Sequence, residues 1–285
     1  MTVARFWSAR GSEIIITEDI GGDGGGGGRG GGWTGRGGGR GIGGGGAGPS
    51  GPAAMVQPDF ANVILLIDDG AHLSTTFVDV SDTPHSPTAG LDVVHNNASL
   101  AFAGDTSSIL FDGDSDHLNI PDHADFDLNG DVHYGMDCAF KTSVGGLLIA
   151  KYDFNSQRAF QFEVEIATGK CRFILYHSRT TGGSALVYTS DTVCTDDEWH
   201  HVCFTHEEVP SENWVGRLFV DGVLEHEEGH TQTLQIDDTT PPVRVGIDNN
   251  GNGDFTGRIA WPRMWKNTLG PTETFINPTE GPPLS

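Results

Sequence analysis

Short runs of apolar residues separated by turn-forming residues recur along the chain from residue 58 onward. Clear examples lie at residues 63–67, 170–177, 200–205 and 216–220, where apolar side chains are continuous or alternate with polar ones. Clusters of Gly, Asn, Asp, Pro or Ser separate nearly all the runs, as is typical of strands joined by turns. No helix-period stretch of useful length appears. The other predicted strands lie at residues 99–103, 109–111, 118–120, 138–141, 146–151, 159–166, 186–189, 243–247 and 256–265.

This pattern predicts an all-β domain, because more than ten short strands in one domain of this size indicate a sandwich or barrel. Asp221 and Gly222 stand between apolar runs at residues 218–220 and 223–225. Asp-Gly is strongly favoured in two-residue turns that join antiparallel strands, since both positions need positive φ. We therefore predict a β-hairpin at this point.

The N-terminal part of the chain differs in composition from the rest. Residues 1–20 form a short segment with strand-like residues at 14–17, and residues 21–57 form a tract rich in Gly. Such a tract has almost no side chains to bury, so it is either a flexible linker or a segment that packs closely against other chains in an oligomer. We expect a globular domain at residues 58–270 and a C-terminal tail at residues 271–285.

The formal net charge is −23 at pH 7, and the first 57 residues contribute little to it because they hold five Arg and four acidic residues. An acidic domain is a poor partner for nucleic acid, whose phosphates need clustered cations. The first 20 residues lack the apolar core of a signal peptide, and no segment approaches the roughly 20 apolar residues of a membrane span. We expect no nucleic-acid partner, no membrane insertion, and synthesis in the cytoplasm without a signal peptide.

The cysteines predict buried, reduced thiols. None belongs to a C-x-x-C pair, and each lies in an apolar, strand-like run, where a free Cys behaves as a small hydrophobic residue. The four are Cys138, Cys171, Cys194 and Cys203.

Several segments carry a resemblance to a known family. Residues 110–121 read LFDGDSDHLNIP, residues 197–202 read DEWHHV, and residues 217–223 read RLFVDGV. Residues 243–246 and 255–259 follow in the same order. Over about residues 60–268 the chain resembles the laminin-G-like and pentraxin-like jelly rolls of the concanavalin A-like lectin/glucanase superfamily. The resemblance implies a two-sheet antiparallel jelly-roll sandwich, here preceded by the glycine-rich segment.

A second resemblance concerns the biological setting. Residues 58–66 and 74–80 look like the start of jelly-roll domains appended to bacteriophage virion proteins. This implies a non-catalytic structural or adhesion module of a tail, fibre or capsid decoration, located in the virion. Its expected partners are other virion subunits, further copies of itself and host-surface glycans. The alternatives are a bacterial extracellular carbohydrate-binding or adhesion domain and, in third place, a glycoside hydrolase.

Two patterns that suggest catalysis are incomplete. Residues 226–230 match H-E-x-x-H, but positions i and i+4 of a strand lie about 13 Å apart, too far for one zinc ion. Glycosidases of the related fold need paired carboxylates on one strand. The nearest candidates, Glu163 and Glu165, have Ala167 where a third carboxylate would stand. No nucleophile-elbow or P-loop motif occurs. We therefore expect no catalytic residues.

One segment is a candidate calcium site. Its oxygen-bearing side chains stand at every second position, as in the first half of a calcium-binding loop, but Ile259 occupies the position of the closing Glu. Both interpretations stay open: a turn between strands, or a weak Ca²⁺ site, with no other cofactor expected. Acidic strings at residues 68–79 and 112–122 carry the same two interpretations. The candidate ligands are Asp248, Asn250, Asn252 and Asp254.

The aromatic residues suggest both core and surface roles. Trp199, Phe204 and Phe219 stand at positions that resemble the family core. Trp214 follows a polar stretch and, together with Trp261, is a candidate for stacking on the face of a sugar ring. The alternative interpretation is a partly buried loop anchor.

Overall fold

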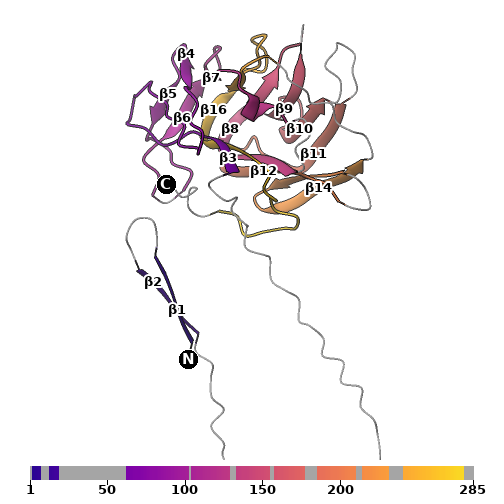
Figure 1. Cartoon of the computed structure of the whole chain (residues 1–285). Helices are drawn as coiled ribbons and strands as arrows, with labels where there is room; N and C mark the ends of the chain where they lie inside the picture. Colours follow the sequence, from indigo (N-terminus) through magenta and orange to yellow (C-terminus); the bar gives the residue numbers. More distant parts are fainter. Residues whose placement is uncertain are drawn as a thin grey trace, which may run out of the picture. The chain divides into compact units, whose positions relative to one another are not determined.

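A computed structural model describes residues 62–102, 104–128, 133–154, 157–176, 185–209, 214–230 and 240–278, together with two N-terminal strands. The chain divides into two compact units, Met1–Gly51 and Pro52–Ser285. In the first unit, β1 (Thr2–Trp7) pairs antiparallel with β2 (Glu13–Glu18), which contains the predicted strand-like residues (Figure 1). The glycine-rich tract, predicted to be a linker or assembly segment, lies outside the described residues.

The second unit is a sandwich whose first sheet runs in the order β14-β13-β12-β8-β16. Beyond β16, strands β6 and β3 pair with its other side, and β5 pairs with β6. All of these pairs are antiparallel. The strands are β3 (Val63–Leu66), β5 (Val94–Asn96), β6 (Ser108–Asp112), β8 (His133–Tyr152), β12 (Trp199–Glu207), β13 (Trp214–Val220), β14 (Val223–His230) and β16 (Thr256–Lys266).

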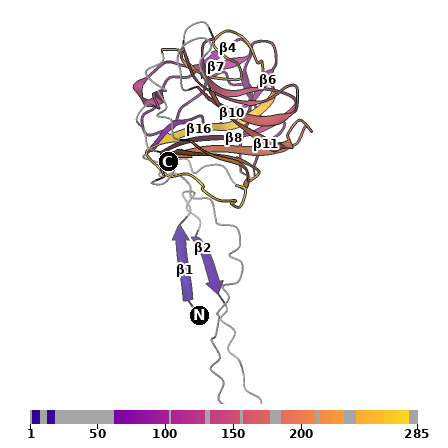
Figure 2. The same ribbon diagram turned by 90° about the vertical axis from the view of Figure 1, so that its right-hand side faces the viewer.

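The second sheet runs in the order β11-β10-β9-β8-β15-β7-β4, again with antiparallel pairs. Figure 2 labels β11, β10, β8, β7 and β4 of this sheet. A short 3-10 turn, η2 (Ala124–Phe126), follows β7. The strands not yet introduced are β4 (Thr88–Gly90), β7 (His117–Ile120), β9 (Arg158–Val164), β10 (Lys170–Tyr176), β11 (Ala185–Val193) and β15 (Val243–Val245).

Strand β8 belongs to both sheets. Residues 134–141 pair with β12 and β16, whereas residues 146–152 pair with β9. The change falls at Gly145 and Gly146, whose φ angles are +105° and +131°. A Cβ at Gly146 would lie 2.5 Å from the carbonyl oxygen of Asp254, so only glycine fits there. The backbone of β8 thereby carries one sheet into the other.

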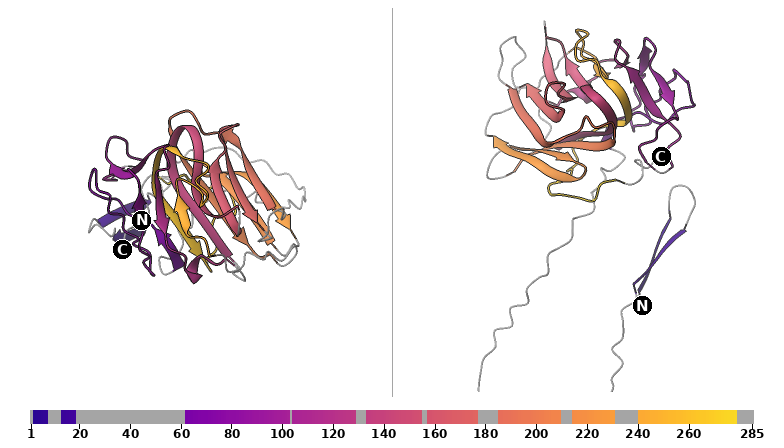
Figure 3. Two further views of the ribbon diagram at one scale, coloured as in Figure 1. Left: turned by 90° about the horizontal axis from the view of Figure 1, so that it is seen from above. Right: turned by 180° about the vertical axis from the view of Figure 1, so that it is seen from behind.

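The core lies between the sheets because alternate residues of each strand face inward. Phe173 of the second sheet stacks on Phe204 of the first, with ring centroids 3.6 Å apart. Both rings are fully buried. On the other face of the first sheet, Phe275 packs against Phe219 in a second apolar cluster, and its N–H donates to the carbonyl oxygen of Gly222. The sandwich therefore includes part of the predicted C-terminal tail (Figure 3).

Several predictions from the sequence are confirmed. The domain is an all-β, two-sheet antiparallel sandwich. Asp221 and Gly222, with φ angles of +50° and +79°, join β13 to β14 as a tight hairpin. All four cysteines are buried and unbridged.

Among the described residues, no helix has the length and apolar character needed to cross a membrane.

The predicted strand at residues 99–103 is wrong. Its described residues form bends instead. The N–H of Phe102 donates to Asp105 Oδ2 at 2.9 Å, and Ser99 uses its carbonyl oxygen to accept the hydroxyl of Ser108. These side-chain contacts replace a ladder of backbone hydrogen bonds, which an alternating pattern alone does not foresee.

Candidate functional site

The outer face of the second sheet presents a row of side chains across neighbouring strands. In β9 and β10, core phenylalanines alternate with polar residues, so the polar residues point away from the core. Antiparallel register places Ile174 opposite Gln161, Gln161 opposite Ala150, and Ala150 opposite Arg244. Arg244 is in turn opposite Asn119. Hydrogen-bonding side chains thus share one sheet face.

An aromatic group lies at one end of this sheet, and we call it the Arg158 cluster: Tyr152, Phe154, Arg158 and Tyr176. Strand β8 ends at Tyr152, β9 begins at Arg158, and β10 ends at Tyr176, so the sheet brings the three together. The Arg158 Cζ atom lies 5.6 Å, 4.7 Å and 5.7 Å from the ring centroids of Tyr152, Phe154 and Tyr176. These distances are typical of cation–π contacts.

The guanidinium of Arg158 is held without a carboxylate partner among the described residues. It is 7% exposed, its Nη2 donates to the carbonyl oxygen of Phe154 at 3.3 Å, and its Nε makes no hydrogen bond. A buried cation normally requires a counter-charge, and aromatic faces replace one only in part. The described residues therefore offset the charge of Arg158 with aromatic faces and one backbone carbonyl oxygen rather than with a carboxylate.

The tyrosines of the cluster supply polar atoms beside apolar rings. The Tyr176 hydroxyl donates to Gln161 Oε1 at 2.6 Å, and its ring lies 5.1 Å from that of Tyr152. Burial raises the pKa of Tyr176, and the neighbouring Tyr152 raises it further, so the phenol stays neutral. Phe154 is 50% exposed. An exposed ring with hydrogen-bonding groups beside it suits a sugar, which has apolar faces and polar edges.

The predicted calcium loop adjoins this cluster. Asp248 is buried, and its Oδ1 accepts from the backbone N–H groups of Asn250 and Asn252 at 2.7 Å and 2.8 Å. The Oδ1 of Asn250 accepts from the N–H of Phe154 at 2.6 Å. Asp254 Oδ1 is buried and makes no hydrogen bond. The loop is thus organised by its own side chains and holds Phe154 in place, while Ca²⁺ binding stays a prediction.

The two predicted sugar-stacking tryptophans lie elsewhere. Trp214 begins β13 and stacks on His206 with centroids 5.2 Å apart, and it is half-buried. Trp261 is 8% exposed, stacks on Phe102 at 4.8 Å, and donates from Nε1 to Asp69 Oδ1 at 3.2 Å. The stacking prediction for Trp261 conflicts with this burial, because Phe102 already covers a ring face. For Trp214 it stays a prediction.

The incomplete catalytic patterns have structural partners. Glu163 and Glu165 share a face and both form ion pairs with Arg172, the first at 2.6 Å. Burial raises the pKa of Glu163, although Arg172 opposes the shift. The H-E-x-x-H residues lie on strand β14 rather than on the helix that a zinc protease would need. There His230 Nε2 is 3.1 Å from His206 Nε2 rather than beside His226.

The Arg158 cluster was not predicted from the sequence. The sequence does indicate that Arg172, Ile174 and Tyr176 share one face of a strand, because they alternate with apolar residues. That pattern does not reveal which side chains of β8 and β9 lie beside them. A polar loop context, which favoured Trp214, is a weaker guide to an exposed aromatic ring than sheet register.

The fold defines a lectin-like β-sandwich. Residues 112–274 match the family model of the concanavalin A-like lectin/glucanases superfamily. The match covers more than half of the chain, so the chain belongs to this superfamily, as the sequence motifs predicted. A search of curated protein sequences found no match.

Several solved structures share the fold. The binding domain of Paraclostridial Mosquitocidal Protein 1 has a TM-score of 0.54 at 11% identity, over 73% of this chain and 49% of that one. The receptor-binding domain of botulinum neurotoxin type G has a TM-score of 0.51 at 12% identity, over 75% and 50%. A structure of botulinum neurotoxin type C, which depends on two ganglioside molecules to enter cells, has a TM-score of 0.50 at 12% identity, over 73% and 49%. The chain spans about half the length of these structures, and the likeness concerns the fold alone.

Proposed function

We propose that the sandwich is a non-catalytic glycan-binding module whose binding site is the Arg158 cluster. The observation that carries this proposal is a buried guanidinium with no carboxylate partner among the described residues, surrounded by aromatic rings of which Phe154 is 50% exposed. A sugar ring would stack on Phe154 and Tyr176, and an acidic or hydroxyl oxygen of the glycan would accept from Arg158.

Two further facts support a glycan rather than a peptide or nucleic acid. The chain belongs to a lectin superfamily, and a structure with the same fold belongs to a toxin that depends on gangliosides. Nucleic acid needs clustered cations for its phosphates, whereas Arg158 is the one basic residue of the Arg158 cluster. Because Arg158 is cationic, the proposed ligand class is an acidic glycan.

A glycan array tests the proposal with the full-length protein, which is then titrated with the best acidic glycan. Phe154→Ala should weaken binding at least tenfold, since stacking on an aromatic ring contributes on the order of 1–3 kcal/mol by analogy with stacked bases. Tyr176→Ala should do the same. Ile166→Ala is the matched control, because Ile166 is also exposed but stands beyond the other end of β9.

The outcome identifies the site. Binding that survives Phe154→Ala and Tyr176→Ala would contradict the Arg158 cluster. Loss in Trp214→Ala instead would place the site at the start of β13 in the first sheet. Binding only to neutral glycans would remove the proposed role of Arg158.

We also propose that the module belongs to a virion, as a tail, fibre or capsid-decoration component that contacts other subunits and its own copies. The basis is the resemblance of residues 58–66 and 74–80 to phage jelly rolls, together with the glycine-rich tract ahead of the sandwich. Light scattering of the full-length protein and of a chain starting at Gln57 tests this. A defined oligomer formed only by the full-length chain supports assembly through the N-terminal segment.

The alternative setting is a bacterial extracellular carbohydrate-binding or adhesion domain, which predicts monomers in both preparations. A glycoside hydrolase is the third candidate. Its nearest carboxylates, Glu163 and Glu165, are paired with Arg172. Hydrolysis that is lost in Glu163→Gln but not in Phe154→Ala would support an enzyme over a binding module.

A further inference from the structure

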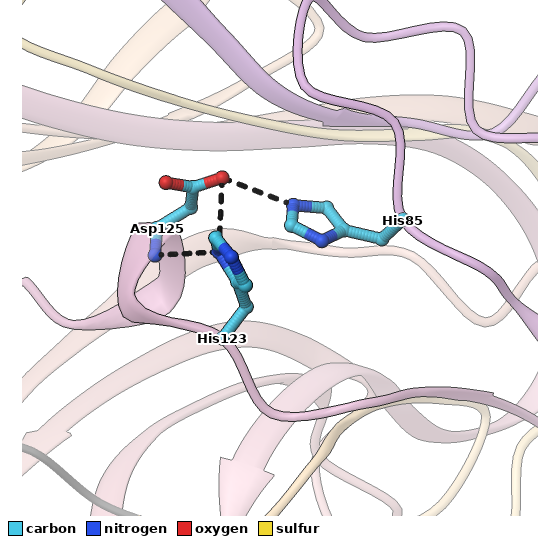
Figure 4. Close-up of side chains that lie close together, drawn as sticks. All are labelled: His85, His123 and Asp125. Atoms are coloured by element: carbon cyan, nitrogen blue, oxygen red, sulfur yellow. Dashed lines mark hydrogen bonds and ion pairs between the residues drawn. The ribbon is translucent and has the colours of Figure 1, made fainter.

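Two histidines and one aspartate meet at one point of the sandwich, His85 from one loop and His123 with Asp125 from the turn η2. Asp125 Oδ2 lies 3.3 Å from His85 Nε2 and 3.1 Å from His123 Nδ1, and the three atoms all lie within 4.8 Å of one another. Figure 4 shows both imidazole rings directed at the same carboxylate oxygen. No other such group of His, Cys, Asp or Glu ligands occurs in the described part of the chain.

The surrounding fold holds each of these residues in place. Asp79 is buried and accepts from the N–H groups of Leu66 and His85, which fixes the loop that carries His85. His123 caps the N-terminus of η2, and fully buried Phe126 anchors that turn. The His85 ring packs on Phe126 at 4.5 Å. The cluster therefore needs no rearrangement of the backbone to form.

The distances match those between ligands of a bound transition metal. Two ligands at about 2.0–2.1 Å from a tetrahedral zinc ion lie about 3.3 Å apart. The separations of Asp125 Oδ2 from His123 Nδ1 and His85 Nε2, 3.1 Å and 3.3 Å, agree with this. Imidazole nitrogens favour zinc and related metals, whereas Ca²⁺ and Mg²⁺ prefer oxygen ligands.

The hydrogen bonding also leaves room for a cation. The His85 side chain is 8% exposed, yet its Nε2, which is aimed at the cluster, has no hydrogen bond of acceptable geometry. His123 Nδ1 accepts from the N–H of Asp125 at 3.2 Å, so it carries a lone pair rather than a proton. The N–H of Asp125 uses that lone pair, so a metal ion bound to Nδ1 would displace this hydrogen bond and be coordinated by the Asp125 carboxylate beside it.

We propose that His85, His123 and Asp125 form a binding site for a divalent transition metal of the zinc class, independent of the glycan site. The hydroxyl of Thr83 donates to Asp125 Oδ2 at 2.9 Å and so helps to orient the carboxylate. Three protein ligands leave a fourth position of a tetrahedral site, and the 55% exposed side chain of His123 gives the cluster contact with solvent. Water or a donor group from a partner takes that position. The metal links the His85 loop to η2.

Calorimetry with zinc chloride on chelator-treated, full-length protein tests the site. We expect one equivalent to bind, with Ca²⁺ unable to compete. His123→Gln and Asp125→Asn should each weaken the affinity at least tenfold. The exposed position of His123 makes His123→Gln compatible with folding, which circular dichroism verifies. Zinc should raise the melting temperature of the wild type but not that of His123→Gln.

Two controls make the test specific. His72→Gln removes an exposed histidine outside the cluster and should bind zinc as the wild type does. His206→Gln disrupts the buried pair that His206 forms with His230, and should leave the affinity unchanged. The proposal is overturned if the wild type binds no zinc, if His123→Gln and Asp125→Asn bind normally, or if only His206→Gln abolishes binding.

Discussion

The replacement Arg263→Met removes one half of the most buried ion pair described in the sandwich. Asp137 on β8 and Arg263 on β16 are 3% and 4% exposed. Arg263 Nε donates to Asp137 Oδ1 at 2.8 Å, and Nη2 donates to Oδ2 at 2.5 Å. His201 Nε2 lies 3.3 Å from the same Oδ2. The pair links the two central strands of the first sheet.

The pKa of Asp137 shows how strongly the folded protein stabilises its charged carboxylate. Burial alone would raise that pKa, but the charge of Arg263 and the hydrogen bonds from His201 and Arg263 outweigh burial and lower it to about 2. Against an ordinary value of 3.8 this shift corresponds to about 2 kcal/mol. Because the folded-state pKa is depressed, this stability is present above about pH 4 and is lost as the pH falls towards 2.

Arg263→Met should lower the free energy of unfolding at pH 7 by about 3–5 kcal/mol, because it leaves Asp137 buried and uncompensated. Burial then dominates and raises the pKa of Asp137 above its ordinary value. Lowering the pH from 7 to 5 should therefore narrow the gap between variant and wild type. Urea unfolding followed by circular dichroism at both pH values measures this.

Arg258→Met is the matched control on the same strand. Arg258 hydrogen-bonds Asn96 and Ser108 rather than a carboxylate, so its loss should cost about 1–2 kcal/mol with no change between pH 7 and 5. The reasoning is refuted if Arg263→Met costs less than 1 kcal/mol, or if its cost is the same at both pH values.

Three further predictions concern the hairpin, a histidine and the thiols. Gly222→Ala should lower the free energy of unfolding by about 2–4 kcal/mol, because φ is +79° and the new Cβ would lie 2.3 Å from the Phe275 carbonyl oxygen. Gly251→Ala is the control, because open space surrounds that position, and it should cost about 1 kcal/mol. Chemical denaturation measures both values. The hydrogen bond to Asp221 raises the pKa of His200 to about 9. Replacing His200 with Gln should therefore lower the free energy of unfolding by about 2 kcal/mol at pH 6 and by little at pH 10. A pKa of His200 near 6.5 in an NMR titration would contradict this. The four buried cysteines should resist a thiol reagent in the native state and all react in denaturant, and rapid native labelling would show that the core opens.

Local patterns were sufficient to predict much of the architecture. Alternating and continuous apolar runs identified most strands, and Asp221-Gly222 identified the hairpin, because side-chain periodicity and positive φ are properties of a few neighbouring residues. At residues 99–103 the same kind of pattern predicted a strand that the structure does not contain. The backbone groups of this segment bond to Asp105 and Ser108 instead of a neighbouring strand.

The candidate site was beyond the reach of such patterns. Trp261 is a residue type that stacks on sugar rings, but Phe102, more than a hundred residues earlier in the chain, covers one face of its ring. Tyr176 and Arg158 carry no distinguishing local signal and become neighbours only because β9 and β10 pair in one register. Register depends on the packing of the whole sheet rather than on any single strand.

The sequence by itself determined the fold class, the superfamily, the hairpin and the reduced cysteines, since each depends on short-range periodicity or on motifs in fixed order. Only the tertiary structure decided which side chains meet. His85 and His123 are 38 residues apart in number and adjacent in space. Contacts of this kind arise from the pairing of distant strands and from core packing. A short stretch of sequence does not contain both partners, so it cannot reveal the contact.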